Sequence, residues 1–151
     1  MDDYRIERLS PSNLCYVQAL YRSVYNKNAS IEFLTGKYQT TSFGVEWLGH
    51  VAVTYDHKAA AFYGLIPCHF NIKNETFLAG QAVDAMTHPL HQRNGLFTQL
   101  VETTHDLARQ EGVQFVFGFP NRNSYPGLFK LGWKFLPRPM QYFLLEASAL
   151  P

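Results

Sequence analysis

The chain has 151 residues, of which 46% are hydrophobic and 17% are charged, and its formal net charge is +1. A length of this order suits one hydrophobic core, so we expect a single domain over residues 1–151. The charge is nearly balanced and forms no basic block or stripe, which argues against nucleic acid as a partner.

Export and membrane insertion are not indicated either. No apolar run approaches the roughly 20 residues of a membrane span, and MDDYRIERLS at the N-terminus lacks the apolar stretch of a signal peptide. Cys15 and Cys68 stand alone, without the CxxC spacing of a metal site. Such cysteines are typical of reduced, packed thiols, and we expect a cytoplasmic protein.

The first part of the chain predicts one strand and two helices. Residues 4–9 alternate between apolar and polar side chains, as a strand does. Ser10 or Ser12 is a candidate N-cap for the helix that follows, whose apolar residues recur at helical spacing: Leu14, Val17, Leu20, Tyr21 and Val24. A weaker helical segment covers residues 30–38, with an apolar face of Ile31, Phe33 and Leu34.

The pattern then changes to period two. Residues 50–56, 59–72 and 76–87 each predict a strand, and the short polar connections between them favour an antiparallel meander. Gly64 and Pro67 mark irregular or edge points in the middle strand.

An amphipathic helix follows Gly95 and ends near Gly112, the expected C-terminal glycine. Residues 113–119 form a near-continuous apolar strand, typical of a strand covered on both faces. We therefore expect the aromatic residues of this strand in the core: Phe115, Phe117 and Phe119.

A short helix at 124–131 and strands at 133–136 and 140–146 complete the order β-α-α-β-β-β-α-β-α-β-β. The unit at 76–119 should be a right-handed crossover between parallel strands. The predicted class is therefore α/β (α+β), with a mixed, mostly antiparallel sheet of about six to seven strands and helices on both faces.

The stretch THPLHQRNGLFTQL at residues 87–100 brings a glycine to the start of a helix. A helix N-terminus offers four unpaired N–H groups and about half a positive charge, and Gly95 lacks the Cβ that would keep a bulky anion away. Gln92 and Arg93 can reach the same anion from outside. This end contributes on the order of 1 kcal/mol, up to about 2 kcal/mol when partly buried, which orients a phosphate without explaining tight binding.

This stretch, followed by FGFPNRNSYPGLFKLGW, resembles the acyl-CoA-binding core of the GCN5-related N-acetyltransferases. The family signature Q/R-x-x-G-x-G/A matches from Gln92 to Leu96 and departs at Phe97, where the family has a small residue. The place of Phe97 in the apolar stripe of the helix predicts that it faces the core and leaves the anion site open. The element order resembles that of the family over nearly the whole chain.

The resemblance implies acetyl-CoA, or another acyl-CoA, as cofactor. Its pyrophosphate would be held around the helix start by Gln92, Arg93, Asn94, Gly95, Leu96, Phe97 and Thr98. Its pantetheine arm would pair with the backbone of Asp84, Ala85, Met86 and Thr87, where the fourth and fifth strands diverge. Asn121 matches an asparagine that commonly contacts the cofactor in this family.

Acetyl transfer to an amine requires a base that removes a proton from the amine, and it is helped by an acid that protonates the leaving thiolate. Asp84 is the first choice for the base, because it lies on the strand nearest the expected thioester. Its plain alternative is a carboxylate satisfied by neighbouring backbone N–H groups. His69 and His88 are second choices because of the usual histidine pKa.

The acid is harder to assign. The family usually has a tyrosine four residues before the glycine that ends the later helix, which is Gly132 here, and this position is Leu128. Tyr125, three residues earlier, is the obvious substitute, although it could equally serve packing alone. Thiolate release can also proceed without an acid from the protein.

A metal is not expected, because the pair His88 and His91 in H-x-x-H has no third ligand at a defining spacing. The acceptor groove implied by the resemblance would contain several aromatic residues, consistent with a sugar-like or aromatic amine: Tyr21, Tyr25, Tyr38, Trp47, Trp133 and Tyr142. The later segment resembles a branch of the family that often carries a second domain, so residues 1–151 could be a short member or part of a longer one. A homodimer also stays open.

The leading hypothesis is therefore an acyl-CoA-dependent N-acyltransferase that transfers acetyl from acetyl-CoA to a primary amine of a small molecule. The alternative is a non-catalytic acyl-CoA-binding or sensor module that has lost the acid at Leu128. A nucleotide-binding domain ranks below both, since G-x-G-x-x-G and its acidic ribose contact are missing.

Overall fold

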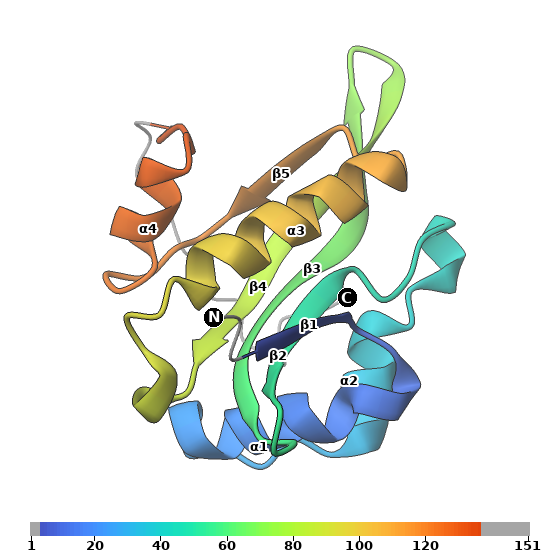
Figure 1. The fold of residues 1–151 in the computed structure, drawn as a ribbon. Helices are drawn as coiled ribbons and strands as arrows, with labels where there is room; N and C mark the ends of the chain where they lie inside the picture. The colour runs from blue at the N-terminus through green and yellow to red at the C-terminus, as the bar shows by residue number, and fades with distance from the viewer. Residues whose placement is uncertain (1–3, 137–151) are drawn as a thin grey trace, which may run out of the picture.

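The computed structural model of the protein describes residues 4–136, whose five strands form one sheet in the order β1-β2-β3-β4-β5 (Figure 1). The first four strands are antiparallel neighbours: β1 (Tyr4–Arg8), β2 (Gly49–Thr54), β3 (Ala59–Ile72) and β4 (Glu75–Thr87). The last strand, β5 (Phe115–Gly118), runs parallel to β4. This confirms the predicted meander and the predicted parallel crossover.

Four α-helices accompany the sheet in the described part of the chain: α1 (Leu14–Tyr25), α2 (Ile31–Tyr38), α3 (Leu96–Gln110) and α4 (Tyr125–Lys130). Short 3-10 turns lie at Pro11–Asn13, Thr41–Phe43 and Pro89–His91. The Ser30 side chain caps α2 by accepting a hydrogen bond from the Phe33 N–H. Ser10, one of the two predicted N-cap residues, is the N-cap of the 3-10 turn that leads into α1, and its N–H donates to the amide oxygen of Asn13. Asn13, rather than a serine, occupies the N-cap position of α1 itself.

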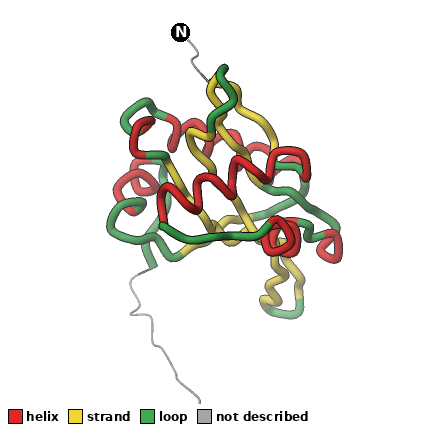
Figure 2. Tube along the Cα trace, turned by 90° about the horizontal axis from the view of Figure 1, so that it is seen from below, coloured by secondary structure: helices red, strands yellow, loops and turns green. Residues whose placement is uncertain are grey.

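The two faces of the sheet carry different helices, because side chains alternate along each strand. Val51, Val53 and Phe62 pack with α1 and α2, whereas Ala52 and Tyr63 face the other way and pack with α3. Figure 1 shows α3 crossing in front of the sheet, and in Figure 2 the tip of the β3–β4 hairpin extends beyond the rest of the fold. The predicted α+β class with helices on both faces is confirmed.

A bulge bends β4 near its carboxyl end. Phe62 pairs with Met86 and Gly64 pairs with Val83, so β4 has one residue more than β3 in this interval. Asp84 lies in the bulge with φ 47°. An extra residue bends a strand and redirects its side chains, and this bulge turns the Asp84 carboxylate toward α1 and α2.

Gly64 is needed beside this bulge. A Cβ at Gly64 would lie 2.9 Å from Cε1 of Tyr38 and 3.0 Å from its hydroxyl oxygen. The missing side chain lets the Tyr38 ring pack close to β3 and its hydroxyl reach Asp84 in the bulge. The predicted irregular point in this strand is therefore the place that admits a tyrosine from α2.

Several local expectations were wrong. Residues 133–136 contain no strand. Residues 140–146 lie outside the described residues, so the strand expected there stays a prediction. On α2, Leu34 and Tyr38 are buried while Ile31 and Phe33 are exposed. Phe119 follows the end of β5 and is exposed, and Phe115 and Phe117 are half-buried against the exposed Phe70, so none of the three lies in the core. Cys15 is an exposed thiol. For the side chains of α2 and β5, the packing of neighbouring elements, rather than the local pattern, decides which face is covered.

Candidate functional site

A cleft of about 790 Å³ lies where β4 and β5 diverge. The two strands pair only as far as Ala82 and Gly118, while β4 continues to Thr87. The edge of β4 from Val83 to Thr87 is therefore not paired with β5. The cleft collects most of the residues predicted to bind the cofactor: Asp84, Ala85, Thr87, Gln92, Arg93, Gly95, Leu96, Phe97, Thr98 and Asn121.

The start of α3 opens into this cleft. Gly95 occupies the N-cap position with φ 75° and no side-chain hydrogen bond to the first turn, and Arg93 also has a positive φ of 65°. Apart from its neighbours along the chain, no described residue would lie within 4 Å of a Cβ placed on Gly95. Alternating left-handed residues at a helix start turn several N–H groups toward one point, which forms an anion-binding concavity.

Phe97 does not block this opening. A Cβ on Gly127 would lie 2.6 Å from Cε1 of Phe97, so the ring fills the space that this glycine leaves between α3 and α4. Its other neighbour is the ring of Tyr63, with centroids 6.5 Å apart and an edge-to-face arrangement. The ring thus packs against the core and forms a side wall of the cleft, as its place in the helical stripe predicts.

Two predicted cofactor residues have other contacts. Met86 is buried against α1 and α2, although its backbone belongs to the unpaired edge of β4. The Asn94 amide donates to the Tyr4 hydroxyl oxygen at 3.0 Å and to the His91 carbonyl at 3.3 Å. The Tyr4 hydroxyl also lies 3.1 Å from Nδ1 of His91. Asn94 therefore fastens the loop before α3 to the first strand.

Asp84 is the centre of a polar cluster at the bulge. Its Oδ2 accepts hydrogen bonds from the hydroxyls of Tyr21 at 2.6 Å and Tyr38 at 2.5 Å, and Lys37 Nζ lies 2.5 Å away. The Asp84 side chain is 12% exposed and that of Lys37 is 18% exposed. The donors to Asp84 are therefore side chains of α1 and α2, and not the backbone N–H groups that the alternative predicted.

Electrostatics keep the two phenols of this cluster protonated. Burial, followed by the hydrogen bond and the negative charge of Asp84, raises the pKa of Tyr21 far above its usual value. Burial and the Asp84 charge raise the pKa of Tyr38 in the same direction. Both hydroxyls therefore stay protonated and donate to the carboxylate, which they hold in one orientation.

A second pocket meets the cleft at Asp84. It lies on the α1 and α2 side and is lined by Tyr21, Tyr25, Lys27, Asn28, Ala29, Ser30, Phe33 and Asp84. Tyr25 and Asp84 border both spaces. Burial, with a smaller contribution from Asp84, raises the pKa of Tyr25, and its hydroxyl donates to the Ala85 carbonyl at 3.4 Å. Two compartments thus share one carboxylate.

A model of a known family, described as an acetyltransferase (GNAT) domain, matches residues 5–136. The chain belongs to the GNAT acetyltransferase family. The match spans the strands and helices described above except for Tyr4 at the start of β1, and it includes the cleft and the bulge. No curated protein matches the sequence.

Solved structures share the GNAT fold at low sequence identity. An acetyltransferase of Trypanosoma brucei has a TM-score of 0.72 at 18% identity, covering 94% of this chain and 100% of its own. Glucosamine-6-phosphate N-acetyltransferase from Arabidopsis thaliana has a TM-score of 0.72 at 14% identity, covering 93% and 97%. An aminoglycoside acetyltransferase from an uncultured soil metagenomic sample, solved with sisomicin, has a TM-score of 0.65 at 16% identity, covering 95% and 98%.

The α4 side of the cleft departs from the family pattern. Leu128, at the position where the family usually has a tyrosine, is buried and lines the cleft. Tyr125 is 42% exposed and stacks on Phe129, outside the group of described residues that line the cleft. Asn121 lines the cleft, and its Oδ1 accepts from the Ser124 N–H at 3.0 Å. The asparagine therefore shapes the turn before α4 whether or not it contacts a ligand.

The other candidate bases and ligands lie elsewhere. Neither of the second-choice bases, His69 and His88, is among the described residues that line the cleft. His69 packs beside Phe43, and His88 Nδ1 accepts a hydrogen bond from the Leu90 N–H. Within residues 4–136, no group of three or more His, Cys, Asp or Glu side chains could hold a metal ion. In the same range, no helix is long and apolar enough to cross a membrane.

Sequence reasoning missed some residues of the site. Tyr63 and Phe119 line the cleft, yet both belong to apolar stretches that predict only a core. Lys37 was not a candidate, because an isolated lysine on a helix is usually a solvated residue. Of the predicted acceptor aromatics, Tyr21 and Tyr25 line the second pocket, Trp47 is buried in the core, and Tyr142 lies outside the described residues.

Proposed function

We propose that the protein transfers an acetyl group from acetyl-CoA to the primary amine of a small molecule. The observation that carries this proposal is the meeting of two compartments at Asp84. The cleft offers backbone N–H groups at the start of α3 and the unpaired edge of β4, which suit an anion and an amide. The second pocket is lined by aromatic and polar side chains. A reaction between a phosphate-bearing donor and a separate acceptor needs this kind of division.

The donor side fits acetyl-CoA in two respects. The first N–H groups of α3, together with Gln92 and Arg93, would hold the pyrophosphate, since the space beside Gly95 is open. The free backbone of β4 between Val83 and Thr87 would pair with the amides of the pantetheine arm. When bound, acetyl-CoA supplies an acetyl group activated as a thioester.

The acceptor side would bind the amine in the second pocket, beside the carboxylate. An alkyl ammonium with a pKa near 10.4 must lose a proton before it can attack a carbonyl carbon. Asp84 would take that proton, directly or through a water molecule, while Tyr21 and Tyr38 fix its orientation. A correctly positioned base of this kind contributes about 10²–10⁴-fold to the rate.

Tyr125 is our candidate for the acid. It begins α4, whose Leu128 forms part of the cleft wall, but its ring would have to turn from Phe129 into the cleft. Because the thiol of the donor is already fairly acidic, this group would contribute less than the base does. A non-catalytic acyl-CoA-binding module stays as the second candidate, favoured by the apolar Leu128 at the usual acid position.

Calorimetry with acetyl-CoA tests the donor site. The wild type should bind with micromolar affinity, about −8 kcal/mol, and Gly95→Trp should abolish binding by filling the opening at the start of α3. Gly112→Trp is the matched control, because Gly112 lies at the other end of α3 with φ 86° and equally open space. Loss of binding in both variants, or in neither, would contradict the assignment.

Turnover then separates the two candidate functions. The chain should release free thiol from acetyl-CoA when supplied with a panel of small primary amines, including amino sugars and arylalkyl amines. Binding without turnover of any amine would favour the non-catalytic module. No binding by the wild type would remove both functions together.

A further inference from the structure

We propose that Lys37 is a site of self-acylation, at which the protein transfers an acyl group from its own bound donor to the Lys37 side chain. The inference rests on the donor site of the proposed function, but not on the identity of the acceptor. It starts from one observation. A primary amine of the protein itself already lies at the carboxylate where the two compartments meet.

The geometry sets Lys37 apart from the other lysines. Its Nζ lies 2.5 Å from Oδ2 of Asp84 and 3.0 Å from the Tyr21 hydroxyl oxygen, and its side chain is 18% exposed. The other lysines are exposed: Lys27, Lys58, Lys73, Lys130 and Lys134. Lys37 alone is thus an amine held beside a carboxylate that borders the cleft.

Three aromatic rings lie close to the amine. Nζ lies 5.8 Å from the centroids of the Tyr21 and Phe33 rings and 5.7 Å from that of Tyr38. Such rings favour a cation and exclude bulk water. The same apolar rings would pack against the methyl group of an uncharged, acetylated lysine. The surroundings therefore suit the amine before the reaction and the amide after it.

The reaction balances with an acyl thioester as the only co-reactant. Asp84 removes one proton from the Lys37 ammonium, and the nitrogen lone pair attacks the carbonyl carbon of the thioester. The new C–N bond forms as the C–S bond breaks, the nitrogen loses a second proton, and the thiolate is protonated. The net products are N-acetyl-Lys37, free thiol and one proton released to solvent.

The modification would change the acceptor pocket. Acetylation removes the charge of Lys37 and with it the ion pair to Oδ2 of Asp84, while the two phenol donors stay. The position of the lysine ammonium beside the carboxylate then becomes available to the ammonium of an incoming acceptor. We expect the acetylated protein to have a lower KM for a cationic amine than the unmodified protein.

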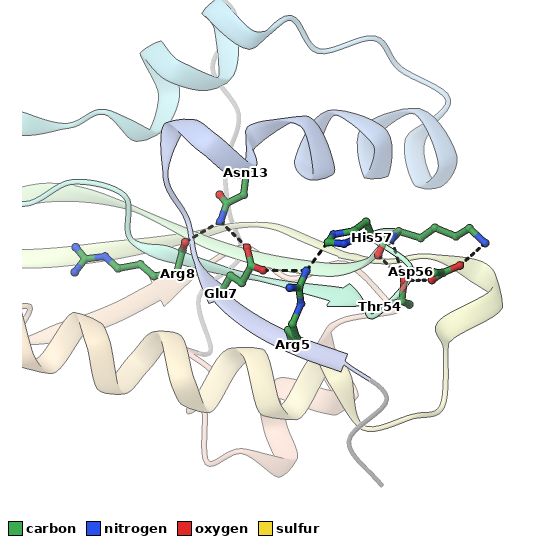
Figure 3. Close-up of polar contacts among 8 residues, drawn as sticks. Arg5, Glu7, Arg8, Asn13, Thr54, Asp56 and His57 are labelled. Atoms are coloured by element: carbon green, nitrogen blue, oxygen red, sulfur yellow. Dashed lines mark hydrogen bonds and ion pairs between the residues drawn. The ribbon is translucent and has the colours of Figure 1, made fainter.

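Mass spectrometry of the full chain tests the inference without any acceptor. After incubation with acetyl-CoA, the Lys37 peptide should gain one acetyl group about tenfold faster than the Lys58 peptide, because the bound donor acts at high effective concentration. Lys58 is the matched control, since it also pairs with a carboxylate, Asp56 at 2.6 Å, but is 73% exposed (Figure 3 labels Asp56). Acetyl phosphate, which lacks the nucleotide, should show no such preference.

Variants make the result specific. Gly95→Trp should bring acetylation of Lys37 down to the rate of Lys58, whereas Gly112→Trp should leave it unchanged. Lys37→Arg should keep acetyl-CoA binding and lose the added mass. If Asp84→Asn does not fold, as judged by circular dichroism, Tyr21→Phe provides a milder disturbance of the same cluster, with slower acetylation expected.

Equal rates at Lys37 and Lys58, or preferential acetylation of Lys27 in the second pocket, would overturn the inference. Acetyl-CoA binding and amine turnover with an unmodified Lys37 would overturn it and leave the proposed function intact. An acetylated Lys37 without turnover of any added amine would support it and contradict small-molecule transfer. Absence of acetyl-CoA binding would remove both.

Discussion

Two carboxylates of this protein each pair with a lysine, but they do so in opposite surroundings. Asp56, in the turn after β2, lies 2.6 Å from Lys58 Nζ and accepts from the Thr54 hydroxyl, and both charged side chains are mostly exposed (Figure 3). Asp84 and Lys37 lie 2.5 Å apart, mostly buried, with two phenols added.

The comparison shows how burial changes the properties of an ion pair between aspartate and lysine. Hydrogen bonds from Lys58 and Thr54 lower the pKa of Asp56 to about 2, but water surrounds this pair and screens it. At Asp84 the surrounding phenols and rings replace water. A buried pair of this kind fixes its members in one geometry, and removing one partner leaves the other uncompensated.

The largest expected contrast between the two carboxylates is in catalysis. Asp84→Asn should lower kcat/KM for an amine acceptor by about 100-fold or more, because an amide cannot take the proton of the amine. Asp56→Asn should leave kcat/KM unchanged. Acetyl-CoA affinity, measured by calorimetry, should be the same in both variants. Retention of most activity by Asp84→Asn would assign the base to another group.

Stability should separate the two clusters next. Tyr38→Phe removes a buried hydroxyl that donates to a carboxylate, and it should lower the free energy of unfolding by about 1.5–3 kcal/mol. Thr54→Val removes the corresponding hydroxyl at Asp56, where water can replace it, and no measurable change is expected. Urea denaturation of both variants measures the difference. Equal losses would mean that burial of the Asp84 cluster adds little.

The pH dependence of stability should also distinguish buried from exposed groups. Burial, followed by the nearby Arg8 charge, lowers the pKa of His50 from 6.5 to about 4. As pH falls, the unfolded chain takes up this proton first, so the stability from neutral His50 is complete above pH 6.5 and is lost toward pH 4. Protonation of His50 should lower the free energy of unfolding by about 3 kcal/mol, since a pKa difference of one unit corresponds to about 1.4 kcal/mol.

Asp56 contributes in another window. Its folded pKa is lowered from 3.8 to about 2, so its contribution is present above pH 3.8 and is lost only as pH falls toward 2.

Urea denaturation at a series of pH values measures the contribution of His50. Between pH 6.5 and 4, the free energy of unfolding should change less steeply with pH for His50→Gln than for the wild type. An unchanged slope in that variant would contradict the buried, neutral His50.

The smallest effect is expected for a substitution of Tyr125. This substitution tests whether the reaction needs an acid from the protein in addition to the base Asp84. Tyr125→Phe should lower kcat by about tenfold or less, with acetyl-CoA affinity unchanged, since the leaving thiol needs little help. Steady-state kinetics measure this. A loss as large as that of Asp84→Asn would show that the ring turns into the cleft during the reaction.

Much of the fold could be predicted because its signals are local. The change from period two to helical spacing near Gly95 locates β4 and α3, and the left-handed conformation found at this glycine is the one its position requires. The family match over residues 5–136 confirms the resemblance seen in QRNGLF. Phe97 faces the core because a helical stripe points one way along its whole length.

The sequence by itself thus determined the order of the elements from β1 to α4, the opening at the start of α3 and the family. Only the tertiary structure decided the polar cluster, because Asp84 lies 63, 47 and 46 residues from Tyr21, Lys37 and Tyr38 along the chain. These side chains meet because one extra residue bends β4 and Gly64 admits a ring beside it. Periodicity indicates which face of its element a side chain points to, but it does not indicate which residue from a distant part of the chain it contacts there.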